Sequence, residues 1–422
     1  MKRWFTVLLA LCMLLSFASA GMAEADAYAV TEPITIEFWH ALSNDELLNQ
    51  LIDEFEKQNP LITVNPIYQG SWTDINTKLS AAISGNNADL LPAVITLNPT
   101  YLGTFVEGGM VECLEDYVKA DGYKVEEFSR GMIETFQWDE KLYGLPYLNS
   151  CLVVYYNADM AQAEGLELPT DWAGMEEFVA KATNDQHKAI GIHCGGAWYY
   201  ECFFTNILPV FGTDHEPTCL LDDPRCLSVA EDLQRWYAEG KLDWLYGSSA
   251  AADGRGAFTS GKYFAYVQSS ATYQTLQQQS DFTVGMAFPF GNERGRYSHV
   301  GGQGIALTAG ASQAQKNAGW QLIKYLTNED CNLALAEVTG YLPTRTTTIS
   351  SEKGQAYLAK YPAFLPIIEM LDYIEYQPRY NNAVNCNSIW MAELSRAIIE
   401  GGDMTEAMLD VTEQIIEIIE EN

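Results

Sequence analysis

The sequence lacks the motifs that mark most common catalytic, nucleotide-binding and metal-binding sites. It contains no G-x-S-x-G nucleophile elbow, no G-x-x-x-x-G-K-[ST] phosphate loop and no H-E-x-x-H metal motif. The segment Gly302-Gln-Gly304 is missing the third glycine of a dinucleotide fingerprint. Histidine occurs only five times and no CxxC pair is present, so a structural zinc site is not expected. We therefore predict no catalytic residue, no metal and no cofactor.

Basic residues are also scarce. Lys and Arg together number 24 against 56 Asp and Glu, which gives a formal net charge of -32 at pH 7. A surplus of this size repels nucleic acid and anionic lipid, so neither is an expected partner. The acidic residues are spread along the chain, a distribution typical of a solvated surface rather than of a binding site.

Beyond the N-terminus, no segment approaches the ~18 consecutive apolar residues of a membrane-spanning helix. Residues 1–23 combine a basic start, an apolar run from Trp4 to Leu15, and small residues that end at Ala20 or Ala23. This pattern predicts a secretory signal peptide. Cys12 follows Leu11, where a bacterial lipoprotein signal has a small residue, so we expect a released rather than lipid-anchored protein in the periplasm or outside the cell.

Nine cysteines in 422 residues are too few for a disulfide scaffold, although export permits disulfides. Cys219 and Cys226 flank Asp222-Asp-Pro224, a turn sequence that could bring the two thiols together. Buried free thiols are an equal alternative, because unpaired cysteine packs like a small apolar residue.

The first part of the chain has a β-α-β-α-β pattern. The expected strands run from Ile34 to His40, from Ile62 to Tyr68 and from Val94 to Leu97. An apolar stripe predicts a helix between the first two strands, stopped by Asn59-Pro60, and a second helix ends at Gly85. This order is typical of a parallel sheet covered by helices.

The later part of the chain repeats the pattern less regularly. We expect helices at Asp171 to Thr183 and Ser228 to Glu239, strands at Tyr263 to Val267 and Phe282 to Met286, and a C-terminal amphipathic helix from Met404 to Ile419. A chain of this length exceeds what one hydrophobic core supports. The sequence therefore predicts an α/β protein with two lobes.

The segment from Gly144 to Asn157 has two interpretations. A turn on Gly144 and Pro146, the polar pair Asn149 and Ser150, and a buried strand from Leu152 to Tyr156 could form a crossing between the lobes, with polar groups facing a cleft. The alternative is an ordinary turn followed by a core strand.

Ligands of open α/β folds lie beyond the carboxyl ends of the strands. The candidate cleft residues in such connections are Trp72, Asn98, Ser150, Trp198 and Ser270. Aromatic rings and small polar groups suit a sugar, which has apolar faces and a rim of hydroxyls. Core packing is the alternative for each aromatic. A secreted glycoside hydrolase or lyase with two carboxylates is the rival function, and an adhesion or scaffold protein is a third.

Six segments together resemble the extracellular solute-binding proteins of bacterial ABC importers, in the family of the sn-glycerol-3-phosphate and many oligosaccharide binders. These segments are ITIEFWH from Ile34, YQGSWTDINTKLSAAISGN from Tyr68, LYGLPYLNSCLVVYYNADM from Leu142, AFTSGKYFAYVQSS from Ala257, VGGQGIAL from Val300 and TGYLPTR from Thr339. Their order and spacing match over nearly the whole mature chain.

The resemblance implies a two-lobed periplasmic-binding-protein-like fold of type II, which closes on a ligand and delivers it to membrane permease subunits. It assigns residues 33–147 and 300–345 to the N-terminal lobe, and residues 148–299 and 346–422 to the C-terminal lobe. It also implies that the protein is not an enzyme and acts as a monomer. The implied ligand contacts are Trp72, Ser150, Trp198, Ser270, the amide of Gly302, and Tyr341.

Two departures from the family pattern concern the ligand. The glycerol-phosphate binder has a glutamate after its third strand, where this chain has Asn98-Pro99. The family's C-terminal arginine corresponds either to Arg379 or, in an ungapped match, to Asn382. A buried phosphate without a cationic partner is poorly compensated. We therefore expect a neutral mono- or oligosaccharide, with sn-glycerol-3-phosphate or a glycerophosphodiester as the alternative.

Overall fold

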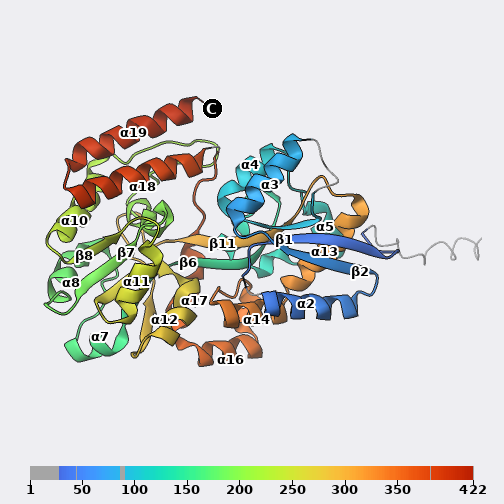
Figure 1. Ribbon diagram of the computed structural model, residues 1–422, viewed down its shortest axis with the longest axis horizontal. Coiled ribbons are helices and arrows are strands. Elements are labelled where there is room, and N and C mark those ends of the chain that lie inside the picture. The colour runs from blue at the N-terminus through green and yellow to red at the C-terminus, as the bar shows by residue number, and fades with distance from the viewer. Residues whose placement is uncertain (1–27, 44, 86–90, 381, 422) are drawn as a thin grey trace, which may run out of the picture.

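Two α/β lobes lie side by side and are connected by strands that run through both (Figure 1). The computed structural model describes residues 28–43, 45–85, 91–380 and 382–421. The signal peptide expected at residues 1–23 lies outside the described residues. Within those ranges, no helix has both the length and the apolar character needed to cross a bilayer.

The N-terminal lobe has a short parallel sheet with helices on its faces. Strand β1 (Ile34–His40) pairs in parallel with β2 (Ile62–Tyr68) and β3 (Val94–Leu97). The helices α2 (Asp45–Gln58) and α3 (Trp72–Ser84) make the crossovers that parallel strands require. These three strand ranges confirm the sequence prediction.

The lobes share one continuous sheet because strand β6 (Leu145–Asn157) changes partner halfway along its length. Its first half pairs with β11 (Ser298–Leu307), and its second half, from Leu152, pairs with β9 (Tyr263–Ser269). The resulting strand order is β2-β1-β3-β11-β6-β9-β7-β8, with β10 on the other side of β6 and β12 beside β11. The segment is therefore a crossing, as the first of its two interpretations proposed.

The prediction of a turn at Gly144 and Pro146 is wrong. Pro146 lies inside β6, opposite Gly304, where the pairing with β11 shifts register. Over this half of the strand, no second described strand pairs with β6, so the missing N–H of Pro146 costs no ladder hydrogen bond. As a result, Asn149 and Ser150 lie within a strand rather than between a turn and a strand.

The C-terminal lobe combines parallel and antiparallel strands. Strand β7 (Lys188–His193) pairs in parallel with β8 (Leu242–Leu245) and β9, whereas β10 (Val284–Ala287) pairs antiparallel with β6. Further helices of the structure include α8 (Met175–Lys181), α9 (Glu201–Thr205), α10 (Pro224–Ala238), α11 (Ala250–Thr259), α13 (Gln313–Leu326), α14 (Glu329–Thr339), α18 (Ala383–Glu400) and α19 (Met404–Glu420).

The crossing strand divides the hydrophobic core within a few residues. Leu148 packs with the N-terminal core around Phe38 and Trp320, and Leu152 packs with the C-terminal core around Trp236 and Trp390. A third cluster includes Val153 and lies against the segment between residues 336 and 374. The lobe limits expected from the sequence stay predictions, since packing alone does not assign this third cluster to one lobe.

The disulfide suggested between Cys219 and Cys226 is wrong, because both thiols are free in the structure. The Asp-Pro segment between them starts α10, with the Asp223 side chain accepting a hydrogen bond from the Arg225 N–H and Pro224 in the first turn. Both cysteines are buried in the C-terminal core. Burial raises the pKa of Cys219 to about 11 and that of Cys226 to about 12, so both behave as inert core residues.

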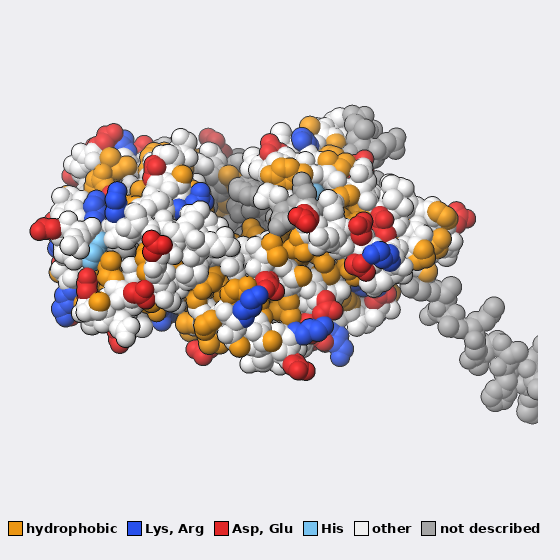
Figure 2. Space-filling model, turned by 60° about the horizontal axis from the view of Figure 1, so that its bottom comes forward, with side chains coloured by type: hydrophobic (Ala, Val, Ile, Leu, Met, Phe, Trp, Pro, Cys, Tyr) orange, Lys and Arg blue, Asp and Glu red, His pale blue; other side chains and the backbone are white. Residues whose placement is uncertain are grey.

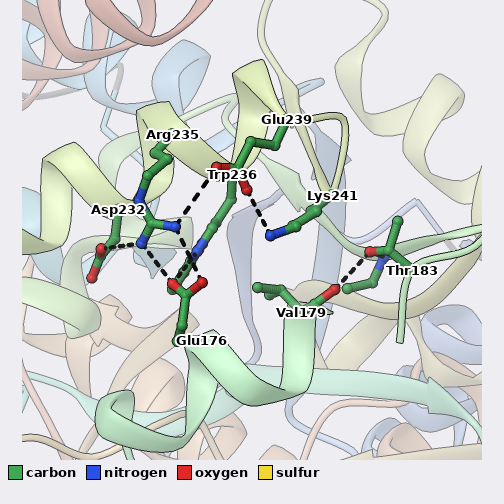
Figure 3. A network of polar contacts seen from close by, with 9 residues as sticks. Glu176, Val179, Thr183, Asp232, Arg235, Trp236, Glu239 and Lys241 are labelled. Carbon is green, nitrogen blue, oxygen red and sulfur yellow. Dashed lines mark hydrogen bonds and ion pairs between the residues drawn. The ribbon is translucent and has the colours of Figure 1, made fainter. Parts of the chain in front are cut away.

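Charged groups are distributed over the surface in small local networks. Acidic and basic side chains alternate over the face seen in Figure 2, without a single charged patch. Figure 3 shows one network, in which the Glu176 carboxylate of α8 accepts hydrogen bonds from Arg235 and Trp236 of α10. The Arg235 hydrogen bond is the largest cause that lowers the pKa of Glu176 to about 2. The network fixes α8 against α10.

Candidate ligand-binding site

Ser150 lies at the middle of the crossing strand, directly opposite Gly301 of β11. Its side chain is buried, and a Cβ on Gly301 would come within 2.8 Å of its Oγ. The neighbouring Asn149 donates from its amide to the Gly301 carbonyl at 3.2 Å. This pair of strands therefore holds polar groups at the junction of the two lobes.

Trp198 reaches the same junction from the C-terminal lobe. It lies in the short 3-10 helix Ala197–Tyr199 that follows β7, and it is half-buried. Its indole N–H donates a 3.0 Å hydrogen bond to the carbonyl of Val300. A Cβ on Gly301 would lie 2.6 Å from the indole Cζ2, so only glycine lets the ring approach the strand this closely.

Gly302 and Tyr341 are also together. Gly302 has φ of 83°, and a Cβ there would lie 2.0 Å from the Leu148 carbonyl oxygen and 3.0 Å from Tyr341 Cε1. Tyr341 follows the left-handed cap Gly340 of α14, and the next residue, Leu342, donates its N–H to the Asn149 carbonyl at 2.8 Å. The backbone therefore fixes Tyr341 against the crossing strands.

Ser270 connects the end of β9 to the crossing. Its hydroxyl accepts a 3.2 Å hydrogen bond from the Cys151 N–H, and it is fully buried. The Tyr155 hydroxyl donates to the carbonyls of Ser269 and Ser270 at 2.8 and 2.9 Å. Ser270 is thus beside Ser150, with its hydroxyl engaged by the strand.

A small pocket of about 180 Å³ opens beside Trp198, and Ser150, Ser270, Gly302 and Tyr341 are not among the residues that line it. Thr100 and Tyr101 of the N-terminal lobe form one wall, and the segment from Gly195 to Trp198, with residues of α18, forms another. Asn98 supports the first wall, because its side chain accepts a hydrogen bond from the Thr100 N–H at 3.0 Å. A groove of about 1250 Å³ on the C-terminal lobe includes Tyr156, Leu168 and Phe288, but none of the predicted site residues.

Of the remaining predicted contacts, Arg379 does not join the group, and the contact expected from Trp72 stays a prediction. Trp72 starts α3, and its side chain lies outside the part of the chain that the structure describes. Arg379 is 3% exposed and forms an ion pair with Asp214, donates to the Thr135 carbonyl at 2.5 Å, and lies 4.0 Å from the centre of the Tyr376 ring. Protein groups therefore occupy the donors of its guanidinium. Asn382, the alternative counterpart of the family's arginine, has a left-handed backbone at the start of α18.

Further polar and aromatic residues that sequence reasoning missed lie next to Trp198. The rings of His193 and Tyr199 are 4.0 Å apart, and Tyr199 lies 5.1 Å from Trp198. The side-chain amide of Gln268 donates a 3.2 Å hydrogen bond to His193 Nδ1. His193 and Gln268 stand at the carboxyl ends of β7 and β9, which is the positional signal that could have identified them. No group of three metal-ligating side chains occurs within the described ranges.

The arrangement defines a two-lobed binding protein, with a tryptophan, hydroxyls and backbone groups gathered where shared strands cross between α/β lobes. The chain belongs to the bacterial extracellular solute-binding protein family, whose sequence model matches residues 50–364. It is a solute-binding component of the kind that serves ABC importers, and the resemblance to this family expected from the sequence is thereby confirmed.

Relatives and solved structures agree with this assignment. The sn-glycerol-3-phosphate-binding periplasmic protein UgpB of Agrobacterium fabrum is 22% identical over 376 residues, which cover 84% of each chain. The fold is similar to that of the sugar-binding protein MalE from Xanthomonas citri, with a TM-score of 0.80, 20% identity, and coverage of 92% of this chain and 98% of that one. UgpB from Mycobacterium tuberculosis, solved with glycerophosphocholine, has a TM-score of 0.77, 21% identity, and coverage of 93% and 99%. The predicted two-lobed α/β fold is confirmed.

Proposed function

We propose that this protein captures a mono- or oligosaccharide between its lobes and delivers it to the permease subunits of an ABC importer. The observation that carries the proposal is the position of Trp198, whose ring is fixed beside Ser150 with only the backbone of Gly301 between them. A ring face next to hydroxyl and backbone groups matches a sugar, which needs an apolar surface and hydrogen-bonding partners together.

The engagement of Arg379 supports a sugar over a glycerol phosphate held at that position. Its guanidinium is already paired with Asp214 and with backbone carbonyls, so accepting a phosphate there would break a buried ion pair. The asparagine at position 98, with its side-chain oxygen used to cap Pro99–Tyr101, supplies no carboxylate for glycerol hydroxyls.

Capture by lobe closure fits the distribution of the proposed contacts. Ser150, Gly302 and Tyr341 lie on or against the crossing strands, and Trp198 and Ser270 come from the C-terminal lobe. Trp72 is the proposed contact on the N-terminal lobe. A ligand favours the closed form only if it gains contacts with both lobes on closure. We propose that the protein works as an exported monomer in the periplasm or at the cell surface.

A thermal unfolding screen of the mature protein against saccharides, sn-glycerol-3-phosphate and glycerophosphocholine tests the proposal. A ligand present at about 100 times its Kd adds about 2.7 kcal/mol to the free energy of unfolding. A clear rise in Tm with a saccharide is the expected result. A rise only with glycerophosphocholine or glycerol phosphate would move the function to the alternative ligand class, and a rise only with a peptide or polyamine would contradict both.

A hydrolase or lyase remains testable in the same samples. Incubation of concentrated protein with the saccharide that raises Tm, followed by mass spectrometry, is expected to return the ligand intact. Progressive cleavage that a single carboxylate substitution abolishes would replace the binding function by an enzymatic one.

A further inference from the structure

The small pocket beside Trp198 is formed by both lobes. Its N-terminal wall is the 3-10 helix Pro99–Tyr101, in which Tyr101 packs against the N-terminal core and stacks on Phe105 at a ring-centre distance of 6.2 Å. Its C-terminal wall consists of the segment that carries Trp198 and of residues on α18, and both elements pack in the C-terminal core. A ligand in this pocket therefore contacts both lobes at once, as stabilisation of a closed form requires.

Among the described residues that line this pocket, none carries a carboxylate, an ammonium, a guanidinium or an imidazole group. Its polar side chains include the hydroxyl of Thr100 and the amides of Gln377 and Asn387, and its apolar side chains include Trp198 and Met391. An amide both donates and accepts hydrogen bonds, as a sugar hydroxyl does. Because the chain has 56 Asp and Glu, a pocket lined by none of them suits an uncharged ligand with hydroxyl groups.

Gln377, in the wall of the pocket, has a hydrogen-bond donor that the protein does not satisfy. Its side-chain amide nitrogen is withdrawn from solvent and makes no hydrogen bond to any described residue. A donor buried in this way is destabilising, because it has lost its hydrogen bonds to water and gained none in return. A ligand oxygen in the pocket is an acceptor that would compensate this loss.

The volume of the pocket corresponds to about one six-membered ring. The pocket measures about 180 Å³, and a cavity of about 150 Å³ is large enough to hold one benzene molecule. Of the contacts proposed so far, Trp198 lines the pocket, whereas those at the crossing strands, such as Gly302 and Tyr341, do not. A ligand that contacts both places must therefore extend past Trp198 and contain more than one ring.

We propose that the pocket is a subsite for one uncharged sugar ring, which lies between Tyr101 and Trp198 and forms hydrogen bonds with Asn387. The next ring of the same ligand lies against the crossing strands at Gly302. This inference rests on the proposed function and narrows its ligand class from a mono- or oligosaccharide to an oligosaccharide of at least two rings. It also adds a described residue of the N-terminal lobe to the proposed contacts.

Isothermal titration calorimetry of the mature protein with monosaccharides and their dimers tests this proposal. The probes are glucose with maltose and cellobiose, galactose with galactobiose, mannose with mannobiose, and xylose with xylobiose. For at least one of these sugars, we expect the dimer to bind about tenfold more tightly than the monosaccharide, because its second ring adds contacts in the pocket.

Two variants on different elements test whether the second ring lies in this pocket. Gly196 lines the pocket with an extended backbone, φ of -178°, and a Cβ there meets nothing within 4 Å, so Gly196→Leu can occupy pocket space without strain. Asn387→Ala removes the amide on α18. Each variant is expected to weaken the dimer about tenfold, and to change the monosaccharide, which we expect at the crossing strands, by less than about twofold.

Each variant has a matched control. Gly256→Leu is the same substitution at an exposed position on α11, where a Cβ also meets nothing within 4 Å. Asn385→Ala is the same substitution at an exposed position on α18 that does not line the pocket. Both controls should bind the dimer like wild type, and thermal unfolding without ligand checks that every variant is folded.

The outcomes distinguish this inference from the function on which it rests. If dimers bind no more tightly than monosaccharides, or if both variants weaken monosaccharide and dimer equally, the second ring is refuted while sugar capture stands. If a dimer binds more tightly and both variants bind it like wild type, the pocket is not the subsite. If the intact protein binds none of these saccharides, the inference and the proposed function are both overturned.

Discussion

The indole nitrogen of Trp198 donates a 3.0 Å hydrogen bond to the main-chain carbonyl of Val300. This contact ties a loop of the C-terminal lobe to a strand that runs through both lobes, beside Ser150. Because the ring is held by this contact and by the flat surface of Gly301, little rotamer freedom remains to be lost when a ligand binds. The site is thus partly preorganised before closure.

Replacement of Trp198 by alanine is expected to weaken saccharide binding by about 2 kcal/mol, roughly thirtyfold in Kd, because the apolar wall of the site is lost. Trp198→Phe retains an aromatic face but loses the hydrogen bond to Val300, so its loss of affinity should be smaller. Calorimetry with the saccharide found in the thermal screen measures both. Equal affinity of wild type and Trp198→Ala would exclude this ring as a ligand contact.

Gly301 is expected to tolerate no side chain without moving the site. In Gly301→Ala, the new methyl group would lie 2.6 Å from Trp198 Cζ2 and 2.8 Å from Ser150 Oγ, so both must shift. Overpacking of this kind costs about 1–3 kcal/mol of stability, and displacement of Trp198 should lower the ligand affinity as well.

Gly256→Ala, within α11, is the matched control, since a Cβ there meets nothing within 4 Å. Alanine favours helix over glycine by up to about 1 kcal/mol, so this control should be neutral or slightly stabilising. Chemical denaturation gives the stabilities and calorimetry gives the affinities. A Gly301→Ala protein that is as stable as wild type and binds normally would contradict the packing at the crossing.

The sequence and the structure agree best where a signal is local. The first and last residues of strands β2 and β3 could be predicted from the sequence, because each short apolar run lies between a helix pattern and a turn signal. The crossing strand was only half recognised, since Pro146 is a strong turn signal and its place in β6 depends on an unpaired strand edge that no local pattern reports.

The candidate site was less predictable than the fold because its residues meet through long-range pairing. Ser150 and Gly301 are brought together by the register of β6 on β11, and Trp198 is placed by a hydrogen bond to Val300. Arg379 is predicted from the sequence as a possible ligand contact, and only the structure shows that its charge is paired with Asp214. The pairing of a charge is a property of three-dimensional neighbours, which composition does not contain.

The buried ion pair between Arg379 and Asp214 is expected to support stability rather than ligand binding. Their side chains are 4% and 8% exposed, so removal of either partner leaves an uncompensated buried charge. Arg379→Ala and Asp214→Ala should each lower the free energy of unfolding by about 3–5 kcal/mol. Urea denaturation measures the loss.

Replacement of both members separates the pair from its surroundings. The double variant Arg379→Met, Asp214→Leu leaves no unpaired charge and should recover part of the stability that either single variant loses. Ligand affinity measured at a temperature where all variants are folded should stay within twofold of wild type. A large loss of affinity in a fully folded Arg379→Met protein would restore this residue as a ligand contact.

Glu201 is expected to make stability fall as pH rises. It is 1% exposed, its Oε2 has no hydrogen-bond partner among the described residues, and burial together with the nearby Glu375 raises its pKa from 4.5 to about 8. Between these two pH values the folded state holds a proton that the unfolded state has lost. The free energy of unfolding therefore decreases with pH across this window, by roughly 1.4 kcal/mol for each pH unit from this group alone.

Glu201→Gln removes this titration and keeps the shape of the protonated side chain. The variant should match wild type near pH 4.5, become progressively more stable than wild type up to pH 8, and show a constant difference above that. Glu216→Gln, an exposed position in the same lobe, should leave the pH dependence of stability unchanged. Urea denaturation at closely spaced pH values gives the comparison. If the difference between Glu201→Gln and wild type is the same at pH 5 and pH 8, Glu201 is already ionised in the folded protein, and a partner for its carboxylate must be sought.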